Sequence, residues 1–424
     1  RDCLLSRGLG DVYKRQVRTI VIVNDFAFIN GGAGQIAISS AIGMVAKGYR
    51  VILFTAVGPV DENLKECGIE IICLNQYDIL HDPNRIRAII QGIWNVKGKN
   101  AFEKLLNTLN KTETIIHFHS WCKALSSSLL FISKKQGFKA VITLHDFFVY
   151  CPNGGFYDYK HSKICIKKPL GITCLFCNCD ARGYTQKIWR CVRQVVQNRV
   201  LHQIDDVIFV SISNLSTRIF QQKYPKKNSL LYRVNNPVEI LSSFERIPVE
   251  NNKMYLFIAR LSLEKGIDLF CEAISQLGLE GCVLGDGYLL DVYRKKYPKI
   301  KFTGWVTGKE KESYIKTAKA FVFPSKCYET FGLSVAEMQS GGVPCIVPDM
   351  NAAAEQIIDG ETGFIFQTGN LESLKEKMRC VEKMDREGLI RMSQQAFDSS
   401  SKDNYSMNTH LDNLVSLYNS FIQR

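Results

Sequence analysis

The chain has 424 residues, of which 46% are hydrophobic and 22% are charged; this composition excludes a disordered, collagen-like or coiled-coil protein. At roughly 150 residues per domain, the length predicts two or three domains. No run approaches the roughly 18 consecutive apolar residues that a membrane-spanning helix needs, so we do not expect a spanning protein.

The excess positive charge lies in the first half of the chain. Residues 1–240 hold 32 Lys and Arg and 17 Asp and Glu, a net +15, whereas residues 241–424 hold 22 and 24, a net −2. This asymmetry favours an anionic partner for the first half, such as a phospholipid surface, a lipid-phosphate or a nucleic acid. The alternative is a basic surface that only keeps the protein in solution.

Residues 1–16 differ from the rest of the chain. They contain no Met, no apolar stretch of the kind found in signal peptides, and no periodicity that leads into the next element. We expect this segment to be non-native sequence and exclude it from the fold.

From residue 17 onward, short apolar runs alternate with amphipathic segments. A β-branched run at 17–24 predicts a buried strand, and the glycine-rich loop at 30–34 leads into a helix at 35–47. Further strands are predicted at 50–55, 70–74, 114–118, 139–144 and 207–211. Strand and helix alternating at this spacing predict a doubly wound parallel sheet.

The same alternation restarts after a polar stretch at 236–253, which we interpret as a linker. Strands are predicted at 255–259, 281–284, 300–303, 320–323, 345–347 and 364–366. The predicted fold is therefore α/β, with two Rossmann-like domains facing a cleft, at 17–235 and 254–402. A last amphipathic helix at 403–424 is expected to pack back on the first domain.

Two cations follow the first strand of the second domain. Arg260 and Lys265 stand five residues apart, and Gly266 allows a close backbone turn. The carboxyl end of a parallel strand is where such folds bind ligands, and two fixed cations suit a diphosphate. The alternative is ordinary surface charge on a loop.

A second pattern surrounds the predicted helix that begins near Phe331. Glu329 lies on the loop before this helix and Glu337 about two turns inside it, because residues eight positions apart do not share a helical face. The N–H groups of Phe331 and Gly332 predict an anion site, and the two carboxylates could accept hydrogen bonds from sugar and ribose hydroxyls. The alternative is two solvated glutamates.

These patterns occur in a particular order. Arg260 and Lys265, the loop Gly285–Gly287, the run Phe302–Val306, and the Glu329/Glu337 pair together resemble the family-four retaining glycosyltransferases, which have the GT-B fold. The resemblance covers nearly all of residues 17–424, including a Cys-rich insertion at 151–191, and is strongest in 255–348.

The resemblance implies roles for individual residues. It places Arg260 and Lys265 on the diphosphate of a nucleotide-sugar, Glu337 on the ribose and Glu329 on the transferred sugar. The base would lie near Gly285, Gly287, Trp305 and Val306, and the diphosphate would approach Gly31, Gly32 and Gly34 of the first domain.

Two histidine segments follow strands of the first domain. His145 best matches the family's histidine that faces the donor sugar, so the resemblance makes His145 and Glu329 the catalytic pair. His119 and Asp146 are candidates for the acceptor side. A purely structural histidine remains the alternative at each position.

Six cysteines crowd into residues 151–191. Cys174 and Cys177 have the spacing of a metal knuckle, and Cys151 and Cys165 would complete a four-thiolate structural site for zinc or, less favoured, an iron–sulfur cluster. The alternatives are free thiols and disulfides.

The sequence therefore predicts a cytoplasmic enzyme, peripheral on the inner face of the plasma membrane, in cell-surface glycan synthesis. It would move a sugar from a UDP- or GDP-sugar to a saccharide or lipid-linked acceptor with retention and without a catalytic metal, and no nucleic acid partner is expected. The rival functions are a nucleotide-sugar epimerase of the same fold and a non-catalytic basic module that binds membranes or nucleic acid.

Overall fold

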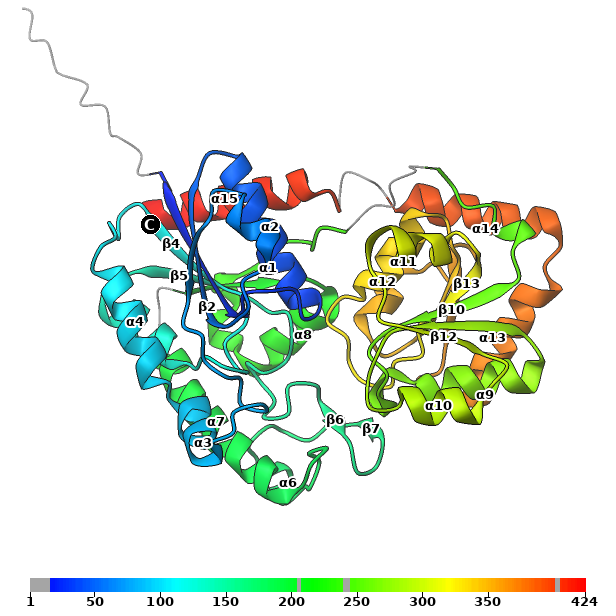
Figure 1. The fold of residues 1–424 in the computed structure, drawn as a ribbon, viewed down its shortest axis with the longest axis horizontal. Helices are drawn as coiled ribbons and strands as arrows, with labels where there is room; N and C mark the ends of the chain where they lie inside the picture. Colours follow the sequence, from blue (N-terminus) through cyan, green and yellow to red (C-terminus); the bar gives the residue numbers. More distant parts are fainter. Residues whose placement is uncertain (1–15, 204–206, 239–244, 401–404) are drawn as a thin grey trace, which may run out of the picture.

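The computed structural model describes residues 16–203, 207–238, 245–400 and 405–424. Apart from Gln16, the segment that we expect to be non-native lies outside these ranges. The described residues form two α/β domains, each built on a parallel sheet (Figure 1). The predicted fold class is confirmed.

The first domain contains a seven-stranded parallel sheet in the order β3-β2-β1-β4-β5-β8-β9. Strand β1 is buried along its whole length, as expected for a parallel strand with helices on both faces. The short edge strand β9 was not predicted. The strands are β1 (Thr19–Phe26), β2 (Arg50–Val57), β3 (Glu70–Cys73), β4 (Thr114–Phe118), β5 (Lys139–Thr143), β8 (Val207–Ser211) and β9 (Leu231–Arg233).

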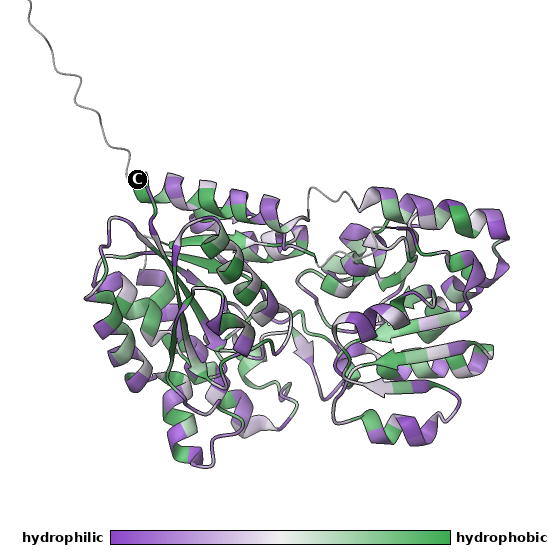
Figure 2. Cartoon of the chain, turned by 45° about the horizontal axis from the view of Figure 1, so that its top comes forward, coloured by the Kyte–Doolittle hydropathy of each residue, from purple (hydrophilic) through white to green (hydrophobic). Residues whose placement is uncertain are grey.

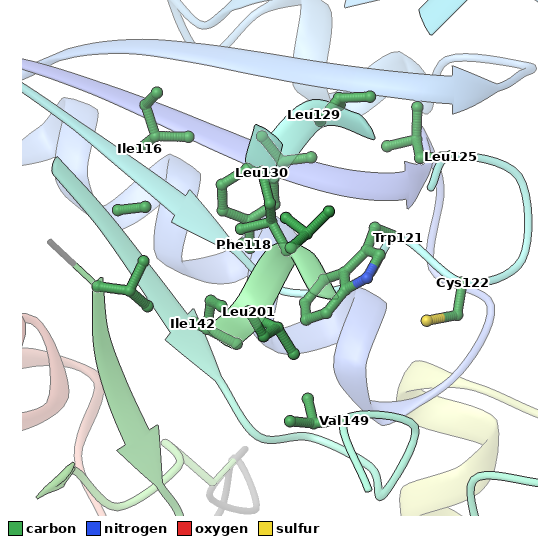
Figure 3. Packing of buried hydrophobic residues seen from close by; sticks show 14 of the residues in the cluster. Ile116, Phe118, Trp121, Cys122, Leu125, Leu129, Leu130, Ile142, Val149 and Leu201 are labelled. Carbon is green, nitrogen blue, oxygen red and sulfur yellow. The ribbon is translucent and has the colours of Figure 1, made fainter. Parts of the chain in front are cut away.

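Two helical layers cover this sheet. Helices α4, α5, α7 and α8 cover one face and bury a large apolar cluster. In this cluster Phe118 and Trp121 lie among Leu125, Leu129 and Leu130 (Figure 3). On the other face α1 packs with the last helix of the chain. The helices are α1 (Gly32–Ala46), α2 (Glu62–Lys65), α3 (Arg85–Ile93), α4 (Val96–Leu106), α5 (Ser128–Lys135), α6 (Ile172–Leu175), α7 (Tyr184–Gln203) and α8 (Asn214–Lys223).

The second domain repeats the plan with a six-stranded parallel sheet in the order β12-β11-β10-β13-β14-β15. The strands are β10 (Met254–Ile258), β11 (Glu280–Leu284), β12 (Lys301–Gly304), β13 (Ala318–Val322), β14 (Cys345–Pro348) and β15 (Gly363–Phe366). Its helices are α9 (Ile267–Leu277), α10 (Leu290–Lys296), α11 (Gly308–Ile315), α12 (Leu333–Ser340), α13 (Leu371–Lys383) and α14 (Arg386–Ser399).

Part of the stretch interpreted as a linker is packed into the second domain. Ile247 and Val249 are buried in its core, and Arg246 forms an ion pair with Glu250 at 2.9 Å. This part of the stretch packs into the core because of its two apolar side chains. The polar composition of the whole stretch had indicated a linker instead.

The chain returns to the first domain after α14. Helix α15 (Met407–Gln423), red in Figure 1, buries Leu411 and Leu414 against α1. Its Tyr418 hydroxyl lies 2.6 Å from Nδ1 of His117 on β4, and Lys139 of β5 donates to the carbonyl of Phe421 at 2.7 Å. The first domain is therefore assembled from both ends of the chain.

The insertion at 151–191 leaves the first domain beside the cleft. It contains the antiparallel hairpin of β6 (Tyr157–Asp158) and β7 (Lys163–Ile164), the short helix α6 and the start of α7. Phe156 contacts Tyr328 of the second domain edge to face, with ring centroids 6.2 Å apart. The insertion thus reaches across to the loop that carries Glu329. In none of the described ranges is a helix both long and apolar enough to cross a bilayer.

Helix α9 begins and ends at glycines in the left-handed region, which allows a matched test of packing. We expect Gly266→Ala to destabilise the protein by several kcal/mol, since an added Cβ would lie 1.9 Å from the Pro324 carbonyl oxygen and φ is +77°. Gly278→Ala, at φ +66° with open space around it, should cost only about 1–2 kcal/mol. Urea unfolding measures both; equal losses would contradict the close contact at Gly266.

Candidate functional site

A cavity of about 1120 Å³ lies between the two domains. The carboxyl ends of strands from both sheets open into it, together with the loop before α1. Thirteen of the predicted site residues line this cavity: Gly31, Gly32, His145, Arg260, Lys265, Gly285, Gly287, Trp305, Val306, Glu329, Phe331, Gly332 and Glu337.

The predicted diphosphate-binding cations are held in ion pairs. Lys265 Nζ lies 2.6 Å from Glu329 Oε1, and Arg260 Nη2 lies 2.9 Å from Glu264 Oε1. Burial opposes the charge on Lys265, but the Glu329 carboxylate outweighs this effect and raises the pKa of the lysine. Both cations therefore lie just after the carboxyl end of β10 and face the cavity.

Glu337 lies in the second turn of α12, as its spacing from Glu329 predicted. Its carboxylate is buried, with only 8% of the residue exposed, and it contacts Nζ of Lys311 at 2.5 Å. Lys311 belongs to α11 and also lines the cavity. Sequence reasoning missed Lys311 because nothing near it in the chain distinguishes it from Lys309, the other lysine of α11.

Glycine lets two strand ends approach each other on the second-domain side of the cavity. Gly285 follows β11 at φ +145°, and a Cβ there would lie 2.0 Å from the Ala259 carbonyl oxygen at the end of β10. The Gly285–Gly287 loop can therefore sit against Arg260 only without side chains at its glycines.

The two domains meet at the centre of the cavity. The Thr330 hydroxyl of the second domain donates to the His145 carbonyl oxygen of the first at 2.7 Å. A Cβ on Gly32 would lie 2.8 Å from Leu333 Cδ1, so the glycine-rich loop lies against the first turn of α12. At the edge, Glu355 accepts the N–H groups of Asn214 and Leu215, at 2.8 and 2.7 Å. These contacts bring His145 next to the loop of Glu329.

A row of histidines lies beneath the cavity. His119 Nδ1 is 2.9 Å from His145 Nε2, and the ring of His117 lies 4.1 Å from that of His119. Burial is the main cause that lowers the pKa of all three, to about 3 for His145. The rings are therefore neutral near pH 7, and one hydrogen bond couples the tautomer of His145 to that of His119.

The remaining predicted residues line a smaller cavity behind the first. Gly34, His119 and Asp146 lie there with Trp121 and Asp25. Burial raises the pKa of Asp146 to about 6, although the Phe148 N–H donates to its carboxylate at 2.9 Å. These three residues therefore line a different cavity from the other predicted site residues, and the His119–His145 contact connects the two cavities.

The predicted four-thiolate site at Cys151, Cys165, Cys174 and Cys177 is not assembled. Within the described ranges, no three or more His, Cys, Asp or Glu side chains are grouped so that they could hold a metal ion. The thiols have other partners: Lys187 donates to Cys174 Sγ at 3.3 Å, and Cys177 donates to Asp158 at 3.6 Å. None of the fourteen cysteines in these ranges is joined to another by a disulfide.

Comparison with known proteins identifies the second domain. Residues 241–398 match the family model described as "Glycosyl transferases group 1". This stretch contains Arg260, Lys265, Glu329 and Glu337, so the resemblance inferred from these residues is confirmed there. The second domain is a glycosyltransferase group 1 domain.

Curated relatives match over a limited part of their length. One segment is 28% identical over 118 residues to a GDP-mannose-dependent alpha-mannosyltransferase of Corynebacterium glutamicum, covering 28% of this chain and 28% of that protein. Another is 28% identical over 137 residues to the sulfoquinovosyl transferase SQD2 of Arabidopsis thaliana, covering 30% of this chain and 26% of that protein. The matches thus span little more than a quarter of these relatives.

Solved structures match the whole fold. Alr3699/HepE of Anabaena, in complex with UDP and glucose, superposes with a TM-score of 0.67 at 15% identity, over 95% of this chain and 100% of that chain. WaaG, a glycosyltransferase involved in lipopolysaccharide biosynthesis, superposes with a TM-score of 0.64 at 13% identity, over 94% and 99%. The two-domain arrangement is the GT-B fold.

The buried histidines predict how stability depends on pH. Burial lowers the pKa of His145 to about 3 and that of His410 to about 4, whereas an unfolded histidine titrates near 6.5. Above about pH 6.5 both states are neutral and the histidines add no pH dependence. Below about pH 6.5 the unfolded state binds protons on these histidines, whereas the folded state does not until the pH reaches its lower pKa. We therefore expect the free energy of unfolding to fall by up to about 1.4 kcal/mol per histidine for each pH unit in that interval.

Urea unfolding at about pH 7.5 and about pH 5.5 measures this loss. His410→Gln should make the dependence shallower, while the matched variant His202→Gln, at an exposed position, should leave it as in the natural chain. A free energy of unfolding that is equal at both pH values would contradict the neutral histidine row.

Proposed function

We propose that the protein transfers a sugar from a nucleotide-diphosphate sugar to an acceptor, with retention of anomeric configuration. The observation that carries this proposal is the convergence of Arg260, Lys265, Glu329 and Glu337 on one cavity that also contains the glycine-rich loop of the first domain. Two cations suit a diphosphate, and two carboxylates suit hydroxyl groups. The glycosyltransferase group 1 domain supports the same conclusion.

The ion pairs suggest how a donor would engage the site. A diphosphate that displaces Glu329 from Lys265 would gain a charge-assisted hydrogen bond and free the carboxylate for hydroxyls of the transferred sugar. Likewise, Glu337 could turn from Lys311 to the ribose. Lys265 and Glu329 thus each exchange a protein partner for a ligand partner, and neither is left buried alone.

The chemistry follows from the leaving group. A nucleotide diphosphate leaves readily once its charge is neutralised, and Arg260 and Lys265 are the cations that the chain offers for this, so we propose that catalysis requires no metal. The residues position the donor and stabilise an oxocarbenium-like transition state. We propose attack from the face that the leaving group vacates, beside the His145 carbonyl, with the leaving phosphate taking the acceptor proton.

The donor and acceptor are proposed by chemical class. A UDP- or GDP-sugar is consistent with the names of the relatives, which include a GDP-mannose-dependent enzyme and a complex with UDP. We propose a saccharide or lipid-linked acceptor on the side of His119 and Asp146, and a role in cell-surface glycan synthesis at the inner face of the plasma membrane.

A thermal-shift screen of UDP-, GDP- and ADP-sugars tests which base the donor carries. The correct donor at about 100 times its Kd should stabilise the protein by about 3 kcal/mol.

Removing either diphosphate cation should disable transfer. We expect Arg260→Ala or Lys265→Ala to lower turnover of the donor from that screen at least about tenfold, because each loses a charge-assisted contact of about 1.5–3 kcal/mol. Lys295→Ala, an exposed position on α10, is the matched control and should retain full activity. Release of the nucleoside diphosphate is measured, with circular dichroism to check the fold.

Two results would count against the proposal. Full activity in both cation variants would remove the donor-site assignment. Conversion of the nucleotide-sugar to an epimer in the absence of any acceptor would identify an epimerase instead.

A further inference from the structure

Exposed apolar side chains are concentrated on one part of the first domain. Twenty large hydrophobic residues are exposed in the described ranges, and thirteen of them fall within residues 77–96 and 166–195. They are Tyr77, Leu80, Ile86, Ile89, Ile90, Val96, Ile166, Ile172, Phe176, Tyr184, Ile188, Val192 and Val195. Single exposed apolar residues are ordinary, but a concentration of this kind marks an interaction surface.

Helix α3 shows the pattern most clearly. It buries its small residues Ala88 and Gly92, while Ile86 is 72% and Ile90 is 59% exposed. Its apolar side chains therefore point away from the domain. In helix α7, Tyr184, Ile188, Val192 and Val195 recur every three to four residues and form a second exposed stripe.

Hydrogen bonds between side chains and backbone join these elements into one surface. The Trp189 indole of α7 donates to the Ile89 carbonyl of α3 at 3.0 Å, and the Tyr184 hydroxyl donates to the Leu175 carbonyl of α6 at 3.0 Å. The three helices lie together at one end of the first domain (Figure 1), and green residues alternate with purple along that end in Figure 2. We call the exposed surface of residues 77–100 and 151–203 the basic apolar face.

The charges on this face have one sign. Residues 77–100 and 151–203 contain thirteen Lys and Arg, of which Lys187 and Arg193 are buried and eleven are not. They contain only four acidic residues, Asp78, Asp82, Asp158 and Asp180. All four aspartates are buried, at 9%, 3%, 2% and 6% exposed. They are also neutralised locally; Asp82 pairs with Arg87 at 2.6 Å and Asp180 with Arg190 at 2.9 Å. The face therefore presents cations and apolar side chains to its partner, and no exposed carboxylate.

We infer that the basic apolar face docks on an anionic phospholipid surface. Apolar side chains that insert at the headgroup boundary and cations that meet anionic headgroups are the two contributions that hold an amphipathic surface on a membrane. A protein partner would be expected to offer carboxylates at defined points, and a second copy of this face would bring like charges together. Exposed cations and apolar side chains without an exposed carboxylate fit a continuous anionic surface better than either.

The position of the face agrees with the proposed function, on which this part of the inference rests. The insertion that carries Lys163 and Lys168 also carries Phe156, whose ring contacts Tyr328 beside the donor loop. A lipid-linked acceptor held in the membrane would thus meet the protein near the mouth of the cleft. Lys160, Lys163, Lys167 and Lys168 of the basic first half belong to this face, whereas Lys139 donates to the Phe421 carbonyl of helix α15.

Co-sedimentation with vesicles tests the inference on the full chain. We expect binding to phosphatidylcholine vesicles that contain phosphatidylglycerol, little binding to phosphatidylcholine alone, and release at high salt. Lys163→Glu with Lys168→Glu, and separately Ile86→Ser with Ile90→Ser, should each weaken binding at least about tenfold. The matched controls Lys295→Glu with Lys299→Glu, and Val292→Ser with Ile358→Ser, alter exposed residues of the second domain and should bind as the natural chain does.

Hydrogen exchange and nucleotide binding make the outcomes distinct. Vesicles should protect residues 77–100 and 160–195, and the face variants should keep their thermal shift with a nucleotide-sugar. Equal, negligible binding to both kinds of vesicle at low salt would overturn the inference. So would a dimer that Ile86→Ser with Ile90→Ser converts to a monomer, since the face would then join two copies of the chain. Vesicle binding without any nucleotide-sugar binding would overturn the proposed function and leave the docking face standing.

Discussion

The geometry of the site depends on one constraint, which is that the strands of a parallel sheet all end on the same side. His145 follows β5, Arg260 follows β10 and Gly285 follows β11, so residues far apart in the chain meet wherever the two sheet edges face each other. The Thr330–His145 hydrogen bond holds those edges together at 2.7 Å. The charged residues of the cleft gain their function from this arrangement, since none of them would face another on an isolated element.

The sequence predicted the elements and residues that obey a local rule. The β-branched runs predicted the long central strands, and the spacing of Glu329 and Glu337 predicted a loop position and a helical one. The strand β9 has only three residues, which is too short for an alternating or apolar pattern to be recognised. Lys311 can be recognised as a site residue only in the folded chain, where α11 places it beside Glu337. Local spacing cannot reveal partners that the tertiary fold supplies.

The cysteine cluster illustrates the same limit. The spacing of Cys174 and Cys177 is typical of metal knuckles, and it predicted a four-thiolate site that would hold the insertion together. In the structure polar contacts hold the insertion instead: Asn153 donates to Cys179 at 3.1 Å, and the buried Lys187 donates to Cys174. This segment takes its shape from a buried lysine held by thiols and from two buried aspartates held by basic side chains. Its remaining cations and apolar side chains lie on the surface.

Helix α15 makes the first domain discontinuous in sequence, because the whole second domain stands between β9 and the helix that completes the first core. During synthesis on the ribosome, the second domain can therefore finish folding while the first still exposes the side of α1 that Leu411 and Leu414 will cover. The order of maturation is then the reverse of the order of translation. Removing α15 would damage the N-terminal core, although the deletion is made at the other end of the chain.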